Sequence, residues 1–197
     1  YYADHQGDDA QSGRLLIRSN LRQANFDLYE VALPRSATNS SMQLGQANWQ
    51  SIVTGDERTY VTNHMVFKAH LFVEVRIDGL DQMMVVEQNG DSHFIQMPEE
   101  SYSLGFGTNA DYGANFLRLS YTSMVTPNTV YDYALDTRVL QQRKVQQVPG
   151  GYDAKNFVTR RLMATARDGA QVPISLVQRH DTPVDGSAPL YLYGYGA

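Results

Sequence analysis

The chain has 197 residues, which is enough to bury a substantial core in one domain or slightly more than one. Its 16 basic and 21 acidic residues give a net charge of -5 with no run of Lys or Arg, so we expect no nucleic-acid surface and no anionic-membrane surface. The absence of cysteine excludes disulfides, thiolate zinc sites and a cysteine nucleophile within the chain, and no apolar run approaches the roughly 20 residues of a membrane span.

The first 150 residues predict short antiparallel strands. Residues 1–13 are polar and acidic and predict a loop. The strand signals that follow are alternating or β-branched runs between turn residues. They cover residues 15–18, 26–33, 49–53, 71–77, 83–87, 92–96, 116–121, 130–135 and 139–140. No window of a dozen residues has helical periodicity, so this region is predicted to be all-β.

Two turns in this region have a strong local signature. Asp78-Gly79 and Asn89-Gly90 consist of residues that tolerate positive φ, and each separates two strand signals. The strands that begin near Leu15, Leu71 and Phe116 open similar sets at spacings of about 45 to 55 residues, which suits four-stranded propeller blades. A β-sandwich fits the same pattern almost as well, and spacing alone does not separate the two.

The character of the sequence changes at Val148-Pro149-Gly150-Gly151-Tyr152, where we place a domain boundary. Beyond it, Asp168-Gly169 predicts a second hairpin. The chain then ends in the apolar run Leu190–Tyr193, followed by Gly194 and Gly196. Such a run predicts a strand buried on both faces, and glycines after a strand are typical of a loop that approaches a ligand.

Several motifs in this order resemble the prolyl oligopeptidase family. They are Tyr121–Tyr131, Val148–Tyr152, Ala166–Gly169 with Val172-Pro173, and Tyr193-Gly194-Tyr195-Gly196. A further segment, Arg18–Asn20 with Asn25–Tyr29, is similar to an earlier propeller blade of the same proteins. The likeness spans essentially the whole chain and is greatest to the oligopeptidase B branch of the family.

The resemblance implies a mainly β fold in two parts. Residues 1–150 would be the C-terminal blades of a seven-bladed β-propeller, and residues 151–197 the first strands of an α/β-hydrolase domain. It also implies a serine peptidase that cleaves short peptides after Lys or Arg, with the propeller controlling access and without a cofactor. A proline-specific branch of the family, and a propeller that only binds a partner, are the alternatives.

The resemblance assigns a role to one residue, Tyr195, whose hydroxyl would donate to the oxyanion. Without the family likeness, Tyr195 would be interpreted as a buried tyrosine bonded to the backbone. The catalytic Ser, Asp and His would lie beyond Ala197, and no Gly-x-Ser-x-Gly occurs in the chain. Because the chain begins with Tyr1 and ends in an apolar run, we expect a segment of a longer protein, which could self-associate through open strand edges.

Other polar clusters have ordinary explanations. Ser92 and His93 would point to opposite faces of a strand, so they cannot cooperate with Asp91 as a triad. Asp4, His5, Asp8 and Asp9 match no metal cage and predict a solvated loop. Glu99-Glu100 and Arg160-Arg161 are expected to be solvated, and His64, His70 and His180 have no partner that spacing identifies. The lack of cysteine fits a reducing compartment, so a cytoplasmic location is expected, with the periplasm as the alternative.

Overall fold

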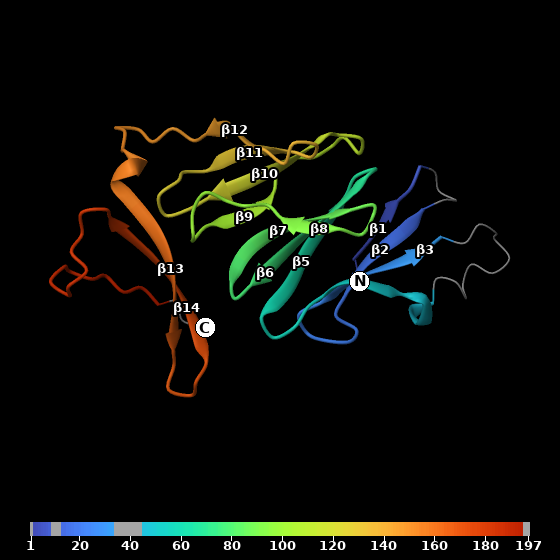
Figure 1. Cartoon of the computed structure of the whole chain (residues 1–197), viewed down its shortest axis with the longest axis horizontal. Coiled ribbons are helices and arrows are strands. Elements are labelled where there is room, and N and C mark those ends of the chain that lie inside the picture. The colour runs from blue at the N-terminus through green and yellow to red at the C-terminus, as the bar shows by residue number, and fades with distance from the viewer. Residues whose placement is uncertain (1, 9–12, 34–44, 195–197) are drawn as a thin grey trace.

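The computed structural model describes residues 2–8, 13–33 and 45–194. These residues form three four-stranded antiparallel sheets and one two-stranded hairpin (Figure 1). Two short 3₁₀ segments, η2 (Gln46–Asn48) and η3 (Ala154–Asn156), lie in the connections.

Each sheet is built from consecutive strands in chain order. The first sheet contains β1 (Tyr2–Gln6), β2 (Arg14–Ser19), β3 (Asp27–Ala32) and β4 (Gln50–Thr54). The second contains β5 (Thr59–Val66), β6 (His70–Ile77), β7 (Leu80–Glu87) and β8 (Ser92–Phe94). The third contains β9 (Ser103–Phe106), β10 (Phe116–Thr122), β11 (Thr129–Ala134) and β12 (Leu140–Val145). The hairpin consists of β13 (Phe157–Thr165) and β14 (Gln171–Arg179).

The three sheets pack face to face, and strand β6 shows how. Its alternate residues Leu71, Val73 and Val75 join one apolar cluster with Leu16 of the first sheet. Phe72, on the opposite face, belongs to a second cluster that includes residues of β10. Because a strand directs successive side chains to opposite faces, the middle sheet is buried on both sides. This stacking of consecutive sheets is that of propeller blades and not of a two-sheet sandwich.

The prediction of three repeated sets is confirmed, but the first strand of each set was missed. Residues 2–6 form β1, so the predicted loop over 1–13 was wrong there. The polar sequence of β1 hides the strand, and all its residues except Gln6 are exposed. In β5 the pairing register shifts between Val61 and Asn63, and such a bulge interrupts the alternation on which the prediction depends.

One of the predicted turns has positive φ at both residues. Asp78 and Gly79 have φ of 49° and 79° between β6 and β7. At Asn89-Gly90 and Asp168-Gly169 only the glycine has positive φ, 89° in both, because longer loops join β7 to β8 and β13 to β14.

The predicted buried strand at Leu190–Tyr193 is not formed. These four side chains are 72–86% exposed, and the residues have no strand conformation. A strand buried on both faces needs neighbouring strands, and no described strand pairs with this run. Among the described residues, no helix has the length and apolar character needed to cross a membrane.

Candidate functional site

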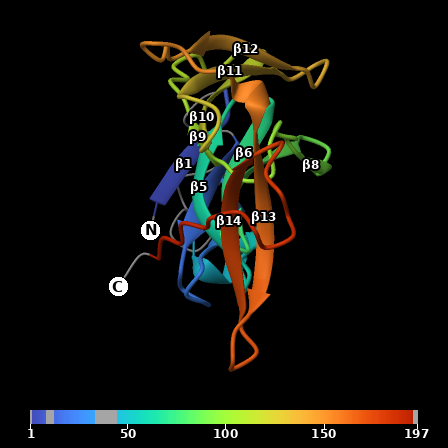
Figure 2. The ribbon, with the colours of Figure 1, turned by 90° about the vertical axis from the view of Figure 1, so that its left-hand side faces the viewer.

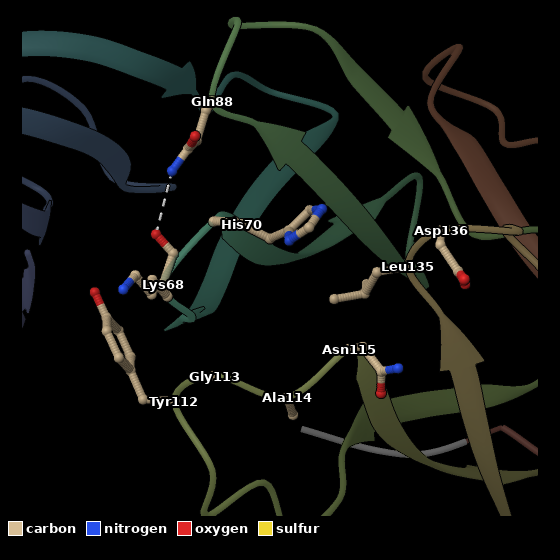
Figure 3. A pocket seen from close by; sticks show the side chains of 10 residues that line it. Lys68, His70, Gln88, Tyr112, Gly113, Ala114, Asn115, Leu135 and Asp136 are labelled. Atoms are coloured by element: carbon tan, nitrogen blue, oxygen red, sulfur yellow. Dashed lines mark hydrogen bonds between the residues drawn. The ribbon is translucent and has the colours of Figure 1, made fainter.

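A pocket lies between the second and third sheets, at the end of the strands where four connections meet (Figure 3). Its volume is about 610 Å³. The β5–β6, β7–β8, β9–β10 and β11–β12 connections supply the lining. The residues are Lys68, Ala69, His70, Gln88, Tyr112, Gly113, Ala114, Asn115, Leu135 and Asp136. A second pocket of about 450 Å³ shares three of them and extends toward the β1–β2 connection.

Hydrogen bonds hold these connections around the pocket. The Tyr112 hydroxyl accepts a bond from the Gly7 amide at 3.0 Å and so links the third sheet to the first. The Lys68 amide donates to the Tyr112 carbonyl at 2.8 Å, and Gln88 Nε2 donates to the Lys68 carbonyl at 3.3 Å (Figure 3). The pocket therefore lies between two sheets, and Tyr112 at its edge links the third sheet to the first.

The pocket is lined by polar and charged groups that can bind a ligand. His70 stacks on Phe72 with ring centroids 6.1 Å apart. Lys68 Nζ pairs with Asp8 Oδ1 at 2.9 Å, and this carboxylate raises the pKa of the lysine. The lining includes His70 and Asp136 but no Ser, Thr or Cys that a histidine could activate. These residues offer hydrogen-bond donors and acceptors to a ligand, and the lining holds no Ser-His or Cys-His pair.

The hairpin lies at the other end of the sheets, beside the β6–β7 turn (Figures 1 and 2). Strand β6 runs from His70 at the pocket to Ile77 near the hairpin, a distance of about 23 Å at about 3.3 Å per residue. The Arg161 guanidinium donates to the carbonyl oxygen of Asp78 in this turn. Pocket and hairpin therefore occupy opposite ends of the second sheet.

Polar contacts of the loop between β8 and β9 hold the hairpin in place. Glu99 Oε2 accepts a hydrogen bond from the Thr159 hydroxyl at 2.9 Å, and Glu100 Oε2 accepts one from the Arg161 amide at 3.2 Å. Ser101 donates to Ser175 of β14 at 2.7 Å. The expectation that Glu99-Glu100 and Arg160-Arg161 are solvated holds for Glu100 and Arg160, which are exposed. It was wrong for Glu99 and Arg161, which are half-buried in contacts with distant segments. Two adjacent acidic or basic residues in a sequence do not indicate that they contact a segment about 60 residues away.

A buried titratable cluster joins the first and second sheets. His64 Nε2 lies 2.9 Å from Asp4 Oδ2, and the imidazole is 2% exposed. Burial lowers the pKa of His64, Asp4 opposes that shift, and the charge of Arg18 adds to it. Arg18 lies 4.5 Å from the centres of both the Tyr2 and Phe26 rings, and it donates to the Val61 carbonyl. This cluster links the first and second sheets and contains no Ser, Thr or Cys side chain.

The residues proposed from sequence are not gathered into one site. Tyr195 lies outside the described residues, as does Asp9. His93 Nε2 contacts the Tyr133 hydroxyl at 2.8 Å, while Asp91 bonds to Asn89 in the turn before it. Within residues 2–8, 13–33 and 45–194, no group of three or more His, Cys, Asp or Glu side chains is placed to hold a metal ion.

Stacked four-stranded blades with a pocket at their junction define a β-propeller segment. A family model described as the prolyl oligopeptidase N-terminal beta-propeller domain matches residues 1–146. The chain therefore belongs to the prolyl oligopeptidase family.

Curated relatives extend the match beyond the propeller. Dipeptidyl aminopeptidase BI of Pseudoxanthomonas mexicana is 37% identical over 199 residues, and Protease 2 of Moraxella lacunata is 31% identical over 197 residues. Both alignments cover 100% of this chain but only 26% of the relative, so the chain spans about a quarter of their length.

Solved structures show the same relation. Oligopeptidase B from Trypanosoma brucei superposes with a TM-score of 0.75 at 26% identity, over 100% of this chain and 27% of that one. Oligopeptidase B from Leishmania major gives a TM-score of 0.70 at 25% identity, over 93% of this chain and 26% of that one.

Proposed function

We propose that the complete protein is a serine oligopeptidase that hydrolyses short peptides after Lys or Arg, and that this chain supplies part of its propeller. The observation that carries the proposal is the whole-chain superposition on oligopeptidase B from Trypanosoma brucei. Residues 1–150 are then propeller blades, and residues 151–197 begin an α/β-hydrolase domain. Since no Gly-x-Ser-x-Gly occurs in the 197 residues, the nucleophile elbow lies elsewhere in the protein.

In this proposal Tyr195 stabilises the oxyanion that forms when the catalytic serine attacks the scissile carbonyl. The exposed run Leu190–Tyr193 just before it supports the proposal, because such an apolar segment needs a sheet to join. A donor aimed at the oxyanion contributes about 3 to 4 kcal/mol to the transition state. Tyr195→Phe in the complete enzyme should therefore lower kcat by at least about a hundredfold and change KM little. An unchanged kcat would mean that Tyr195 has only a packing role.

The propeller would control which peptides reach the active site. Its blades are joined to each other at the pocket end by Tyr112, whose hydroxyl accepts from the Gly7 amide and whose carbonyl accepts from the Lys68 amide. Blades fixed in this way present a rim that admits short, unfolded peptides and excludes folded proteins.

Removal of dipeptides from peptide amino termini is the second candidate activity. It is favoured by the 37% identity to a protein named dipeptidyl aminopeptidase BI. An amino-terminally blocked substrate distinguishes the two activities, because a dipeptidyl aminopeptidase needs a free amino terminus.

The test uses the complete protein with three chromogenic amides: a blocked arginyl amide, a free dipeptidyl amide and a blocked prolyl amide. Cleavage of the blocked arginyl amide, abolished by a serine-directed inhibitor, is the expected result. Cleavage of only the free dipeptidyl amide would favour the second candidate, and cleavage of only the prolyl amide would favour a proline-specific enzyme. If none is cleaved and the remaining sequence lacks Gly-x-Ser-x-Gly, the protein is a propeller that only binds a partner.

A further inference from the structure

Glu99 is the centre of a hydrogen-bonded cluster in the loop between β8 and β9. One carboxylate receives bonds from four neutral hydroxyls, three in the third sheet and one in the hairpin. Oε1 accepts from Tyr121 at 3.1 Å, Ser123 at 2.8 Å and Thr126 at 2.5 Å, and Oε2 accepts from Ser123 at 2.7 Å and Thr159 at 2.9 Å. A carboxylate has about four acceptor positions, so this cluster uses most of its capacity.

The hairpin depends on such polar contacts for its attachment. None of the buried apolar clusters among the described residues includes a residue of β13 or β14. Leu162, Met163, Val172 and Val177 of the hairpin are 40–47% exposed. Two of these polar contacts involve a buried hydroxyl, because Thr159, which donates to Glu99, is 4% exposed and Ser101, which donates to Ser175, is 6% exposed. Hydrogen bonds to an ionised group are stronger than neutral ones, and more so away from water.

We propose that Glu99 is a positioning residue that fixes β13 to the third sheet and thereby orients the segment leading to Tyr195. Glu99 makes two kinds of contact that can be separated. Ser123 and Thr126 tie the carboxylate to the β10–β11 connection of the third sheet, whereas Thr159 is its partner in the hairpin. The expected effect on turnover rests on the proposed function, but the effect on the hairpin does not.

The experiment measures amide hydrogen exchange across Phe157–Thr165, together with kcat and KM for the blocked arginyl amide, in the complete enzyme. Thr159→Val removes only the hairpin donor and keeps the side-chain shape. It should speed exchange in β13 about tenfold, the effect of losing one charge-assisted bond, and lower kcat at unchanged KM. Thr159→Ser keeps the hydroxyl and should restore both values.

Thr126→Val is the matched control, because it removes a Glu99 donor within the blade. It should leave exchange in β13 and kcat unchanged. Glu99→Ala removes the acceptor altogether, so it should speed β13 exchange at least as much as Thr159→Val does. The double variant should add little to Glu99→Ala alone, because both changes remove the bond between these two side chains.

The proposal is overturned if Thr159→Val leaves β13 exchange unchanged, or if Thr126→Val alters β13 as strongly. It is also overturned if the double variant shows the sum of the two single effects. Should the arginyl amide not be cleaved at all, the exchange measurements still decide the role of Glu99, so the two proposals fail separately.

Discussion

Among the polar side chains of the first sheet, we expect Asp27 to contribute most to stability. It is 3% exposed at the start of β3, and it accepts bonds from the buried Tyr29 hydroxyl, from Gln23 Nε2 at 2.8 Å and from the Gly55 amide at 3.0 Å. The carboxylate thus holds the β2–β3 turn, where Phe26 has a φ of 61°, against the end of β4. The informative change is Asp27→Ala in the complete protein.

The expected cost follows from the groups left without an acceptor. Burial, followed by the bond to Asp27, raises the pKa of Tyr29 to about 12, so its hydroxyl remains a proton donor at neutral pH. Leaving this hydroxyl unpaired should cost about 1 to 3 kcal/mol. The Gly55 amide keeps a second acceptor, the Phe26 carbonyl at 3.1 Å, so loss of its bond to Asp27 should add only about 0.5 to 1.5 kcal/mol. Gln23 is half-buried and turns to water, so the total is about 1.5 to 4.5 kcal/mol.

Amide hydrogen exchange in β3 measures this loss. At about 1.4 kcal/mol per tenfold change, the lower bound corresponds to about tenfold faster exchange across Asp27–Ala32. Tyr29→Phe is the matched control, because it removes one donor and leaves the carboxylate paired with two others, at a cost of about 1 kcal/mol. Exchange in Asp27→Ala that stays within about twofold of wild type, or a Tyr29→Phe effect of equal size, would refute this reasoning.

Three further outcomes are expected. Burial holds the pKa of His64 in the folded protein below the unfolded value of about 6.5, so its contribution to stability is present above that pH and is lost as the pH falls below it. His64→Gln should flatten the fall in melting temperature between pH 7 and pH 5, and an unchanged slope would contradict the assignment. Arg118→Lys breaks a two-bond pair with the buried Asp132 (2.7 and 2.9 Å) and should cost about 1 kcal/mol or more, seen as faster amide exchange in β10. Arg179→Lys, at an exposed pair of the same geometry with Asp181, should cost almost nothing, and equal losses at both sites would disprove the role of burial. The purified 197-residue chain should not hydrolyse the arginyl amide, and inhibitor-sensitive cleavage would overturn that expectation.

The sequence alone predicted the features that depend on local geometry. Asp78-Gly79 and Asp168-Gly169 form turns because Asp78 and the two glycines reach positive φ at little cost. The alternation of Leu71, Val73 and Val75 with Phe72 predicted β6. Its two faces pack in two different apolar clusters, because successive side chains of a strand point in opposite directions. The order of the family motifs likewise pointed to the family that the comparison with known proteins established.

Tertiary structure decided what depends on distant partners. Strand β1 is too polar to be recognised alone, and it forms because β2 offers a register from Tyr2 with Arg18 to Gln6 with Arg14. The run Leu190–Tyr193 is apolar enough for a buried strand, yet it stays exposed because no described strand pairs with it. The role of Glu99 is likewise decided by tertiary structure. Its role comes from four hydroxyls at positions 121 to 159, and only the packed chain brings them to one carboxylate.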